Sequence, residues 1–269
     1  MNEIYEKWLK SRPKFKSLRK WNPGMIEKVI ERYPRKENNY LSGFISRVIT
    51  GAPGNGKSVL AYKYMAKLDY VMNGYSKTDE EEYSYKFALD NMIYRPDDFF
   101  GRIKKQIDEK QPALVWTLDD ASIHMGKQLW DLDRETYREL QDRLPVIREF
   151  VTCLFITTIT VKLLAKPFRE FFDKKINVTL AEGFTRFPRC GKHYIKEFYP
   201  DDIRFRVYHP YDDKFSCLVP QPFYDWYHDK KNAALREYNE LREKRKKELK
   251  HELEDEINPE MEKDDESSG

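Results

Sequence analysis

The sequence has few cysteines and no long apolar segment. Cysteine occurs only three times in 269 residues, at Cys153, Cys190 and Cys217, and an odd number of thiols cannot form a fully paired disulfide framework. The longest strongly apolar run, VTCLFITTITV, is too short to cross a bilayer. The first residues, MNEIYEKWLKSR, lack the apolar core of a secretory leader. We therefore expect a cytoplasmic protein without a membrane partner.

An excess of charge of either sign is also absent. The 49 Lys and Arg residues nearly balance the 46 Asp and Glu residues, which leaves a formal net charge of +3. Such a balance does not indicate a nucleic-acid-binding protein as a whole, so any basic binding surface must be local. Apolar residues make up 40% of the chain, which is enough to build a sizeable core.

Short apolar runs alternate with helical patterns over the middle of the chain. Strands are expected at 44–50, 87–95, 113–120, 151–159 and 176–180, and helices at 56–68, 96–110 and 133–149. Strands that alternate with helices are typical of a parallel sheet. We therefore predict an α/β fold in which helices cover both faces of a parallel sheet.

The composition divides the chain into four segments. We predict an N-terminal helical edge segment (1–43), a core (44–180), a β-hairpin with a long charged helix (181–256) and an acidic disordered tail (257–269). The runs HYIKEFYP and IRFRVYHP alternate and are rich in aromatics, which favours an antiparallel hairpin. From Pro222 onward the chain is mostly charged, with acids and lysines spaced to support an exposed helix.

A glycine-rich loop follows the first predicted strand. Its sequence, GAPGNGKS, fits the phosphate-binding pattern G-x-x-x-x-G-K-[ST] at every fixed position. In this pattern the backbone N–H groups form a nest for phosphate oxygens, Lys57 reaches the β- and γ-phosphates, and the Ser58 hydroxyl ligates Mg²⁺. The alternative is a strand-to-helix turn without a ligand. We predict that ATP binds to the loop residues Gly51, Ala52, Pro53, Gly54, Asn55, Gly56, Lys57 and Ser58.

Two aspartates end the predicted strand LVWTLDD. A strand of this kind places an acid at its carboxyl end, beside the glycine loop. We expect Asp119 to hold Mg²⁺ through water, and Asp120 to orient or activate the water that attacks the γ-phosphate. The alternative is a strand that ends in a solvated turn.

Two threonines end the strand VTCLFITTI. A polar side chain at Thr157 or Thr158 is placed to sense the γ-phosphate or the attacking water. β-Branched residues also close many strands for reasons of packing alone, so both interpretations stay open.

Together these segments resemble the P-loop ATPases that have an additional strand and a catalytic acid, the branch that includes the AAA+ and RecA-like motors. GAPGNGKS is similar to the first motif, LVWTLDD to the second and TCLFITT to the sensor strand, and a candidate strand at 87–95 lies between the first two motifs. The resemblance covers about residues 40–180 and extends to small ATPases of archaeal viruses and plasmids and to initiator and helicase-loader ATPases. It implies a P-loop NTPase core that hydrolyses ATP with Mg²⁺.

The same resemblance implies a biological role and an assembly. The role is action on DNA, or on a DNA-bound partner, in the replication of a viral or plasmid element, within the host cytoplasm if the element is a virus. Arg169, in KPFREFFDKKINVTL, matches the position of an arginine finger that would act on a neighbouring copy in a homo-oligomer. Two features depart from the pattern: Asp120 stands where a Glu is usual, and no helical lid is evident after residue 180.

Three other functions use the same loop. A packaging or translocation motor of the same branch would form a ring, a small-molecule kinase would not need Asp120, and a nucleotide-gated structural protein would barely hydrolyse ATP. For DNA, two basic surfaces are candidates: the cluster REKRKKELK (242–250), and the arginines and lysines of the predicted hairpin beside its aromatics. The first also fits a solvated helix, and the second fits packing on the core.

Overall fold

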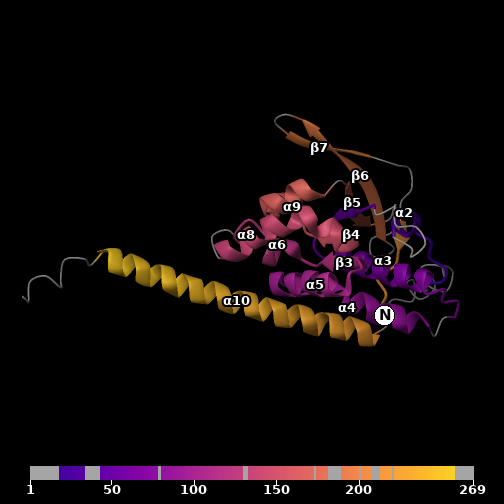
Figure 1. The fold of residues 1–269 in the computed structure, drawn as a ribbon, viewed down its shortest axis with the longest axis horizontal. Coiled ribbons are helices and arrows are strands. Elements are labelled where there is room, and N and C mark those ends of the chain that lie inside the picture. The colour runs from indigo at the N-terminus through magenta and orange to yellow at the C-terminus, as the bar shows by residue number, and fades with distance from the viewer. Residues whose placement is uncertain are drawn as a thin grey trace, which may run out of the picture. The chain divides into compact units, whose positions relative to one another are not determined.

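The computed structural model describes residues 18–33, 43–77, 80–129, 133–172, 174–180, 189–199, 202–207, 213–219 and 221–257. The chain forms two compact units, Met1–His228 and Asp229–Gly269. The first unit contains the sheet and the helices that cover it (Figure 1).

The first unit contains a mostly parallel sheet with the strand order β2-β3-β4-β1-β5-β6-β7, in which β8 pairs with β6. The parallel strands are β1 (Ile45–Thr50), β2 (Met92–Ile93), β3 (Ala113–Leu118), β4 (Val151–Thr157) and β5 (Lys174–Leu180). The antiparallel strands are β6 (Arg189–Tyr199), β7 (Asp202–Val207) and β8 (Asp213–Phe215). The expected parallel α/β sheet is therefore confirmed, and the expected hairpin extends it.

Helices connect the strands and cover both faces of the sheet. The α-helices are α2 (Gly24–Arg32), α3 (Lys57–Met72), α4 (Glu81–Asp90), α5 (Pro96–Glu109), α6 (Ala121–His124), α8 (Arg134–Arg143), α9 (Lys166–Phe171) and α10 (Gln221–Ile257). Short 3₁₀ turns lie at η2 (Leu144–Glu149) and η3 (Val161–Leu163). Within the described ranges, no helix is both long enough and apolar enough to cross a membrane.

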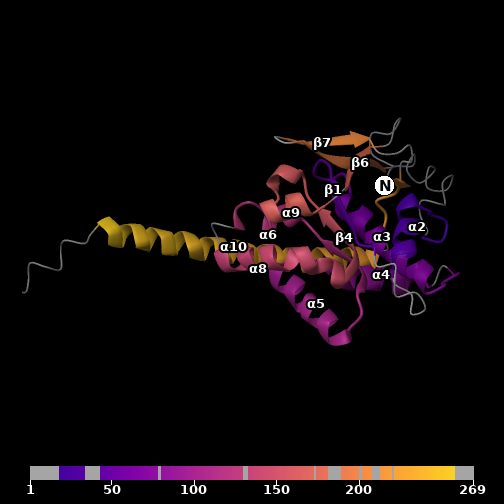
Figure 2. The ribbon, with the colours of Figure 1, turned by 45° about the horizontal axis from the view of Figure 1, so that its top comes forward.

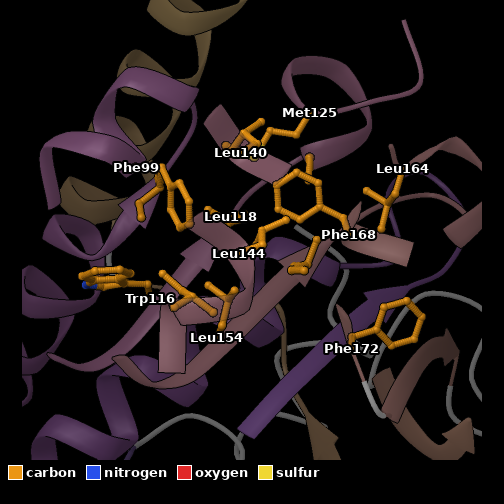
Figure 3. Packing of buried hydrophobic residues seen from close by; sticks show 14 of the residues in the cluster. Phe99, Trp116, Leu118, Met125, Leu140, Leu144, Leu154, Leu164, Phe168 and Phe172 are labelled. Atoms are coloured by element: carbon orange, nitrogen blue, oxygen red, sulfur yellow. The ribbon is translucent and has the colours of Figure 1, made fainter. Parts of the chain in front are cut away.

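One face of the sheet carries the larger apolar core. Trp116 on β3 and Leu154 on β4 point into it and meet Phe99 of α5 and Phe168 of α9 (Figure 3). Side chains of a strand alternate between its two faces. Leu118, two residues after Trp116 on β3, therefore lies in the same core. The core fixes β3 and β4 in the middle of the parallel region.

The opposite face packs against α3, the helix that follows the glycine loop. Tyr64 of α3 stacks on Phe155 of β4 with ring centroids 5.3 Å apart, and Trp21 stacks on the same tyrosine at 5.5 Å. Helix α4 lies beside α3 (Figure 2). By the same alternation, the side chains that continue this face at the strand ends are Asp119 after β3 and Thr157 of β4.

The prediction of a strand over 87–95 was largely wrong. Helix α4 takes up residues to Asp90, and β2 contains only Met92 and Ile93. The apolar residues of α4 recur with the helical period, since Tyr85, Ala88 and Leu89 are all buried. The strand between the two motifs along the chain therefore lies at the edge of the sheet, and β4 is the strand that separates β1 from β3 in space.

The second unit is the charged part of α10 and the residues beyond it. Its basic residues pair with acids one turn away: Lys246 lies 2.5 Å from Glu243, and Arg245 lies 3.3 Å from Glu248. The predicted long charged helix is confirmed, and these pairs favour the solvated-helix interpretation of 242–250 over a phosphate-binding one.

A buried lysine in α3 predicts a pH-dependent effect on stability. Lys63 is 3% exposed, and burial lowers its pKa from the ordinary 10.5 to about 8, although Cys217 and Glu81 act in the opposite direction. The unfolded chain therefore holds this proton more tightly, and the resulting loss of stability is present below about pH 8 and disappears as the pH rises toward 10.5. We expect Lys63→Met to raise the free energy of unfolding at pH 7 by about 2 kcal/mol.

Urea denaturation at pH 7 and at pH 10.5 measures this effect. The gain should shrink toward zero at the higher pH, and Lys104→Met, a change at an exposed position of α5, should alter stability little. A Lys63→Met variant no more stable than the parent at pH 7 would show that the ammonium is adequately solvated or paired.

Candidate functional site

The glycine loop connects β1 to α3, and two of its glycines are required by what surrounds them. At Gly51 (φ 149°) a Cβ would lie 2.5 Å from the Val178 carbonyl oxygen of β5. At Gly56 (φ 88°) a Cβ would lie 2.5 Å from the Cys217 Sγ. Both positive φ values are strained for other residues. The loop is therefore a tight cradle whose backbone shape depends on glycine.

Side chains from neighbouring strands and from the loop itself hold this cradle. The Asn55 Nδ2 donates to the Val178 carbonyl at 3.0 Å, and Arg189 of β6 donates through Nε to the Asn55 carbonyl at 3.1 Å. The buried Lys57 donates through Nζ to the Ala52 carbonyl at 3.2 Å. Arg189, which the sequence grouped with a basic DNA surface, therefore contacts the loop.

The loop fits a polyphosphate group. Ala52, Pro53 and Gly54 are exposed, and a Cβ at Gly54 would have nothing within 4 Å, so the crest of the cradle is open. The first-turn N–H groups of a helix have no acceptor within the helix, and the 16-residue α3 begins at Lys57 directly behind the crest. Ser58 and Asp119 are the oxygen donors that would hold Mg²⁺ beside the phosphates.

Thr157 clamps the two aspartates. Its hydroxyl donates to Asp119 Oδ1 at 2.7 Å and accepts from the Asp120 backbone N–H at 2.8 Å. The register of the sheet brings the three strand ends level, because Ile49 pairs with Thr157 and Leu118 pairs with Ile156. The side chain that the sequence proposed as a sensor thus positions both acids.

The other residues at this edge have distinct environments. Asp120 is half-buried and has a left-handed backbone (φ 46°), a conformation that Asp and Asn tolerate better than most residues. Asp119 is 1% exposed. Thr158 is also buried, but its hydroxyl donates to the Thr160 carbonyl at 3.0 Å. The structure therefore brings Thr157 to the acids and leaves the Thr158 hydroxyl in its own loop.

Tyr227, which the sequence did not suggest, contacts the two groups predicted to bind Mg²⁺. The hydroxyl of this α10 residue donates to Asp119 Oδ2 at 2.9 Å and is also hydrogen-bonded to the Ser58 hydroxyl. Burial, followed by the negative charge of Asp119, raises the pKa of Tyr227, so its hydroxyl keeps its proton at neutral pH. Its ring lies 6.1 Å from that of Tyr94, which follows β2.

Arg169, the predicted arginine finger, and the two arginines that compete for this role, Arg143 and Arg148, lie on three different elements. Arg169 is half-buried on α9, anchored by the buried Phe168. Arg143 is engaged within its own chain, with Nη2 2.6 Å from a Glu139 carboxylate oxygen and its guanidinium over the Phe100 ring at 5.2 Å. Arg148 is exposed on η2. The role of an arginine finger therefore stays a prediction.

Two further features are relevant to function: metal-binding clusters and the basic hairpin surface. Where the structure describes the chain, no cluster of three or more His, Cys, Asp or Glu side chains is arranged to bind a metal. Most side chains of β6 and β7 are outside the description, so the basic hairpin surface stays a prediction.

Comparison with known proteins finds no match in sequence and only distant matches in structure. No protein-family model and no curated protein matches the sequence. Among solved structures, the N-terminal domain of zonular occludens toxin from Neisseria meningitidis is 15% identical, with 68% of this chain and 98% of that chain covered and a TM-score of 0.37. A KaiC-like protein from the archaeon Pyrococcus horikoshii OT3 is 17% identical over 65% and 97% of the two chains, with a TM-score of 0.32. Because both TM-scores are below 0.5, these matches lead to no conclusion about this chain.

Proposed function

We propose that this chain binds ATP with Mg²⁺ at the Gly51–Ser58 loop and hydrolyses it. The observation that carries the proposal is the junction of the loop with the acid pair: the end of β4 lies between β1 and β3, and Thr157 fixes Asp119 and Asp120 beside the start of α3. Phosphoryl transfer to water needs a phosphate cradle, a metal and a group that orients the water. This edge of the sheet supplies candidates for each.

Each residue has a task that follows from its position. Lys57 brings a positive charge next to the loop, where it neutralises charge that develops on the β- and γ-phosphates. Asp119, held on one oxygen by Thr157, is oriented as an acceptor for water bound to a metal. Mg²⁺ would supply Lewis-acid stabilisation of the phosphates when bound.

Asp120 is the candidate that orients the attacking water. Its backbone N–H donates to Thr157, which holds the residue in place. Its left-handed conformation ends the extended backbone of β3, so its side chain does not follow the alternation that places Asp119. A carboxylate accepts a proton from water in hydrogen-bonding distance and can act as a general base. Asp is one methylene shorter than the Glu usual in the resembling ATPases, so we expect slow turnover.

Lys57→Ala tests the binding part of the proposal. We expect the Kd for Mg·ATP to rise about 10- to 100-fold, because a charge-assisted hydrogen bond to phosphate contributes about 1.5–3 kcal/mol. Isothermal titration with the slowly hydrolysed analogue ATPγS measures the change. The fold should survive, since the hydrogen bond from the ammonium to the Ala52 carbonyl lies within the same loop.

Lys104→Ala, on the exposed surface of α5, is the matched control and should bind as the parent does. Circular dichroism and thermal melting establish that both variants are folded. Equal affinity in the parent and in folded Lys57→Ala protein would remove the loop as the nucleotide site.

A second part of the proposal concerns the partner on which the ATPase acts. We propose action on DNA or on a DNA-bound partner, supported by the aromatic and basic sequence of the β6–β7 hairpin and by the sequence resemblance. ATP turnover with and without DNA at matched salt tests it, because a DNA-dependent motor is stimulated and a small-molecule kinase is not. Release of inorganic phosphate without an added acceptor separates hydrolysis from kinase activity.

A further inference from the structure

The first two turns of α10, residues 221–228, form a segment that we call the strap. It belongs to the same compact unit as the glycine loop. Its inward face has two anchors one helical turn apart. Phe223 is buried and stacks on Tyr85 of α4 at 5.7 Å, and Tyr227 reaches the site itself.

The Tyr227 hydroxyl bridges the two groups that the proposed function assigns to Mg²⁺. It donates to Asp119 Oδ2 at 2.9 Å and shares a hydrogen bond with the Ser58 hydroxyl. The other oxygen of Asp119 already accepts from Thr157 at 2.7 Å. A phenol oxygen therefore occupies the space between the serine and the carboxylate.

An ion in this space would compete with that phenol oxygen. Mg²⁺ has near-octahedral geometry with oxygen ligands at about 2.0–2.1 Å and retains several waters. An ion ligated by Ser58 would lie where the Tyr227 hydroxyl now lies. A water on that ion would need to donate to Asp119 Oδ2, which now accepts from Tyr227. A neutral phenol is a poor substitute for a water or phosphate oxygen as a ligand to this hard cation.

Part of the strap is exposed to solvent. Between its two anchors, Tyr224 is 40% exposed and Trp226 is 47% exposed. A small apolar cavity separates the strap from the start of α3 and is lined by Ser58, Val59, Tyr62, Val219, Phe223, Tyr224 and Tyr227. The contacts of Tyr227 beside the site include its hydrogen bonds to Asp119 and Ser58 and its ring contact with Tyr94. The net contribution of each such hydrogen bond is small beside the binding energy of a metal-bound nucleotide.

From this geometry we infer that the strap is an autoinhibitory element: Tyr227 closes the metal position, and Mg·ATP binds only when the strap moves away. The inference rests on the proposed function, since it concerns the same site. In the closed state the loop is intact but Ser58 and Asp119 are occupied. The measured affinity for Mg·ATP is then the intrinsic affinity reduced by the fraction of molecules in the open state.

Tyr227→Phe tests the inference by removing the hydroxyl and keeping the ring. We expect the Kd for Mg·ATPγS to fall about 10- to 100-fold, since two hydrogen bonds are lost and each contributes a factor of about three to ten to the closed state. The Kd for ATPγS in EDTA should change less, because the hydroxyl competes with the metal. Tyr83→Phe removes a hydroxyl from an exposed position of α4, outside the residues that line this cavity, and should leave both constants unchanged.

Hydrogen exchange of the parent protein gives a second readout. Amides of residues 221–228 should exchange faster with Mg·ATPγS than with ATPγS in EDTA. Weaker Mg·ATPγS binding by Tyr227→Phe, or slower exchange of the strap with the metal complex, would overturn autoinhibition and make Tyr227 a residue that supports the ion, with the proposed function intact. If neither the parent nor Tyr227→Phe bound ATPγS, the proposed function itself would fail and the inference with it.

Discussion

Asp120→Asn is expected to slow ATP hydrolysis about 10²- to 10⁴-fold while the Kd for Mg·ATP changes less than about threefold. The carboxylate is assigned to the attacking water, whose proton an amide cannot accept. Asn is the appropriate replacement, because position 120 has a left-handed backbone (φ 46°) that Asn tolerates and Ala does not. Single-turnover hydrolysis and ATPγS titration on the same preparation separate the chemical step from binding.

Two further variants serve as comparisons for Asp120→Asn. Asp108→Asn changes an exposed acid of α5 and should hydrolyse ATP at the parent rate. Asp119→Asn should weaken metal-dependent binding as well as turnover, because Asp119 is the carboxylate assigned to the ion and accepts from both Thr157 and Tyr227. A parent-like rate in Asp120→Asn protein would mean that another group orients the water.

The edge of the sheet that carries the site was predictable from sequence. A phosphate-binding loop requires a strand before it and a helix after it, and acids at the ends of neighbouring parallel strands must meet the same edge. The register confirms this placement, with Ile49 opposite Thr157 and Leu118 opposite Ile156. What the sequence left open was which threonine faces the acids, because that choice depends on which strand face packs on α3.

Other features depend on tertiary packing that no local pattern reveals. The run FALDNMI fits a strand as well as a helix, and the burial of Tyr85 and Leu89 against neighbouring helices decides for α4. Tyr227 lies 108 residues from Asp119 along the chain. In sequence it is one aromatic among several at the start of a charged helix, so only the folded chain shows that its hydroxyl reaches Asp119.

In the parent protein, ATP turnover per chain is expected to rise with protein concentration, and Arg169→Ala should abolish this rise. At concentrations where copies associate, the turnover of the variant should be about 10³-fold lower than that of the parent. The residue follows β4 and η3 and precedes β5, on the short helix α9, and it stands where the sequence resemblance implies an arginine finger. A finger supplied by a neighbouring copy stabilises charge on the γ-phosphate during transfer, so its removal should leave ATPγS binding unchanged. Turnover per chain measured over a wide range of protein concentration shows the effect.

A mixing experiment decides whether the arginine acts between chains. Lys57→Ala protein has a defective loop and an intact Arg169, and Arg169→Ala protein has the reverse, so a mixed interface joins an intact loop to an intact arginine. The mixture should recover part of the activity that both variants lack alone. Arg148→Ala, an exposed arginine on η2, is the comparison: rescue that depends on Arg148 instead would move the finger to that turn. Turnover independent of concentration in the parent, with no recovery on mixing, would leave Arg169 as a surface residue of α9 and the hydrolytic site complete within one chain.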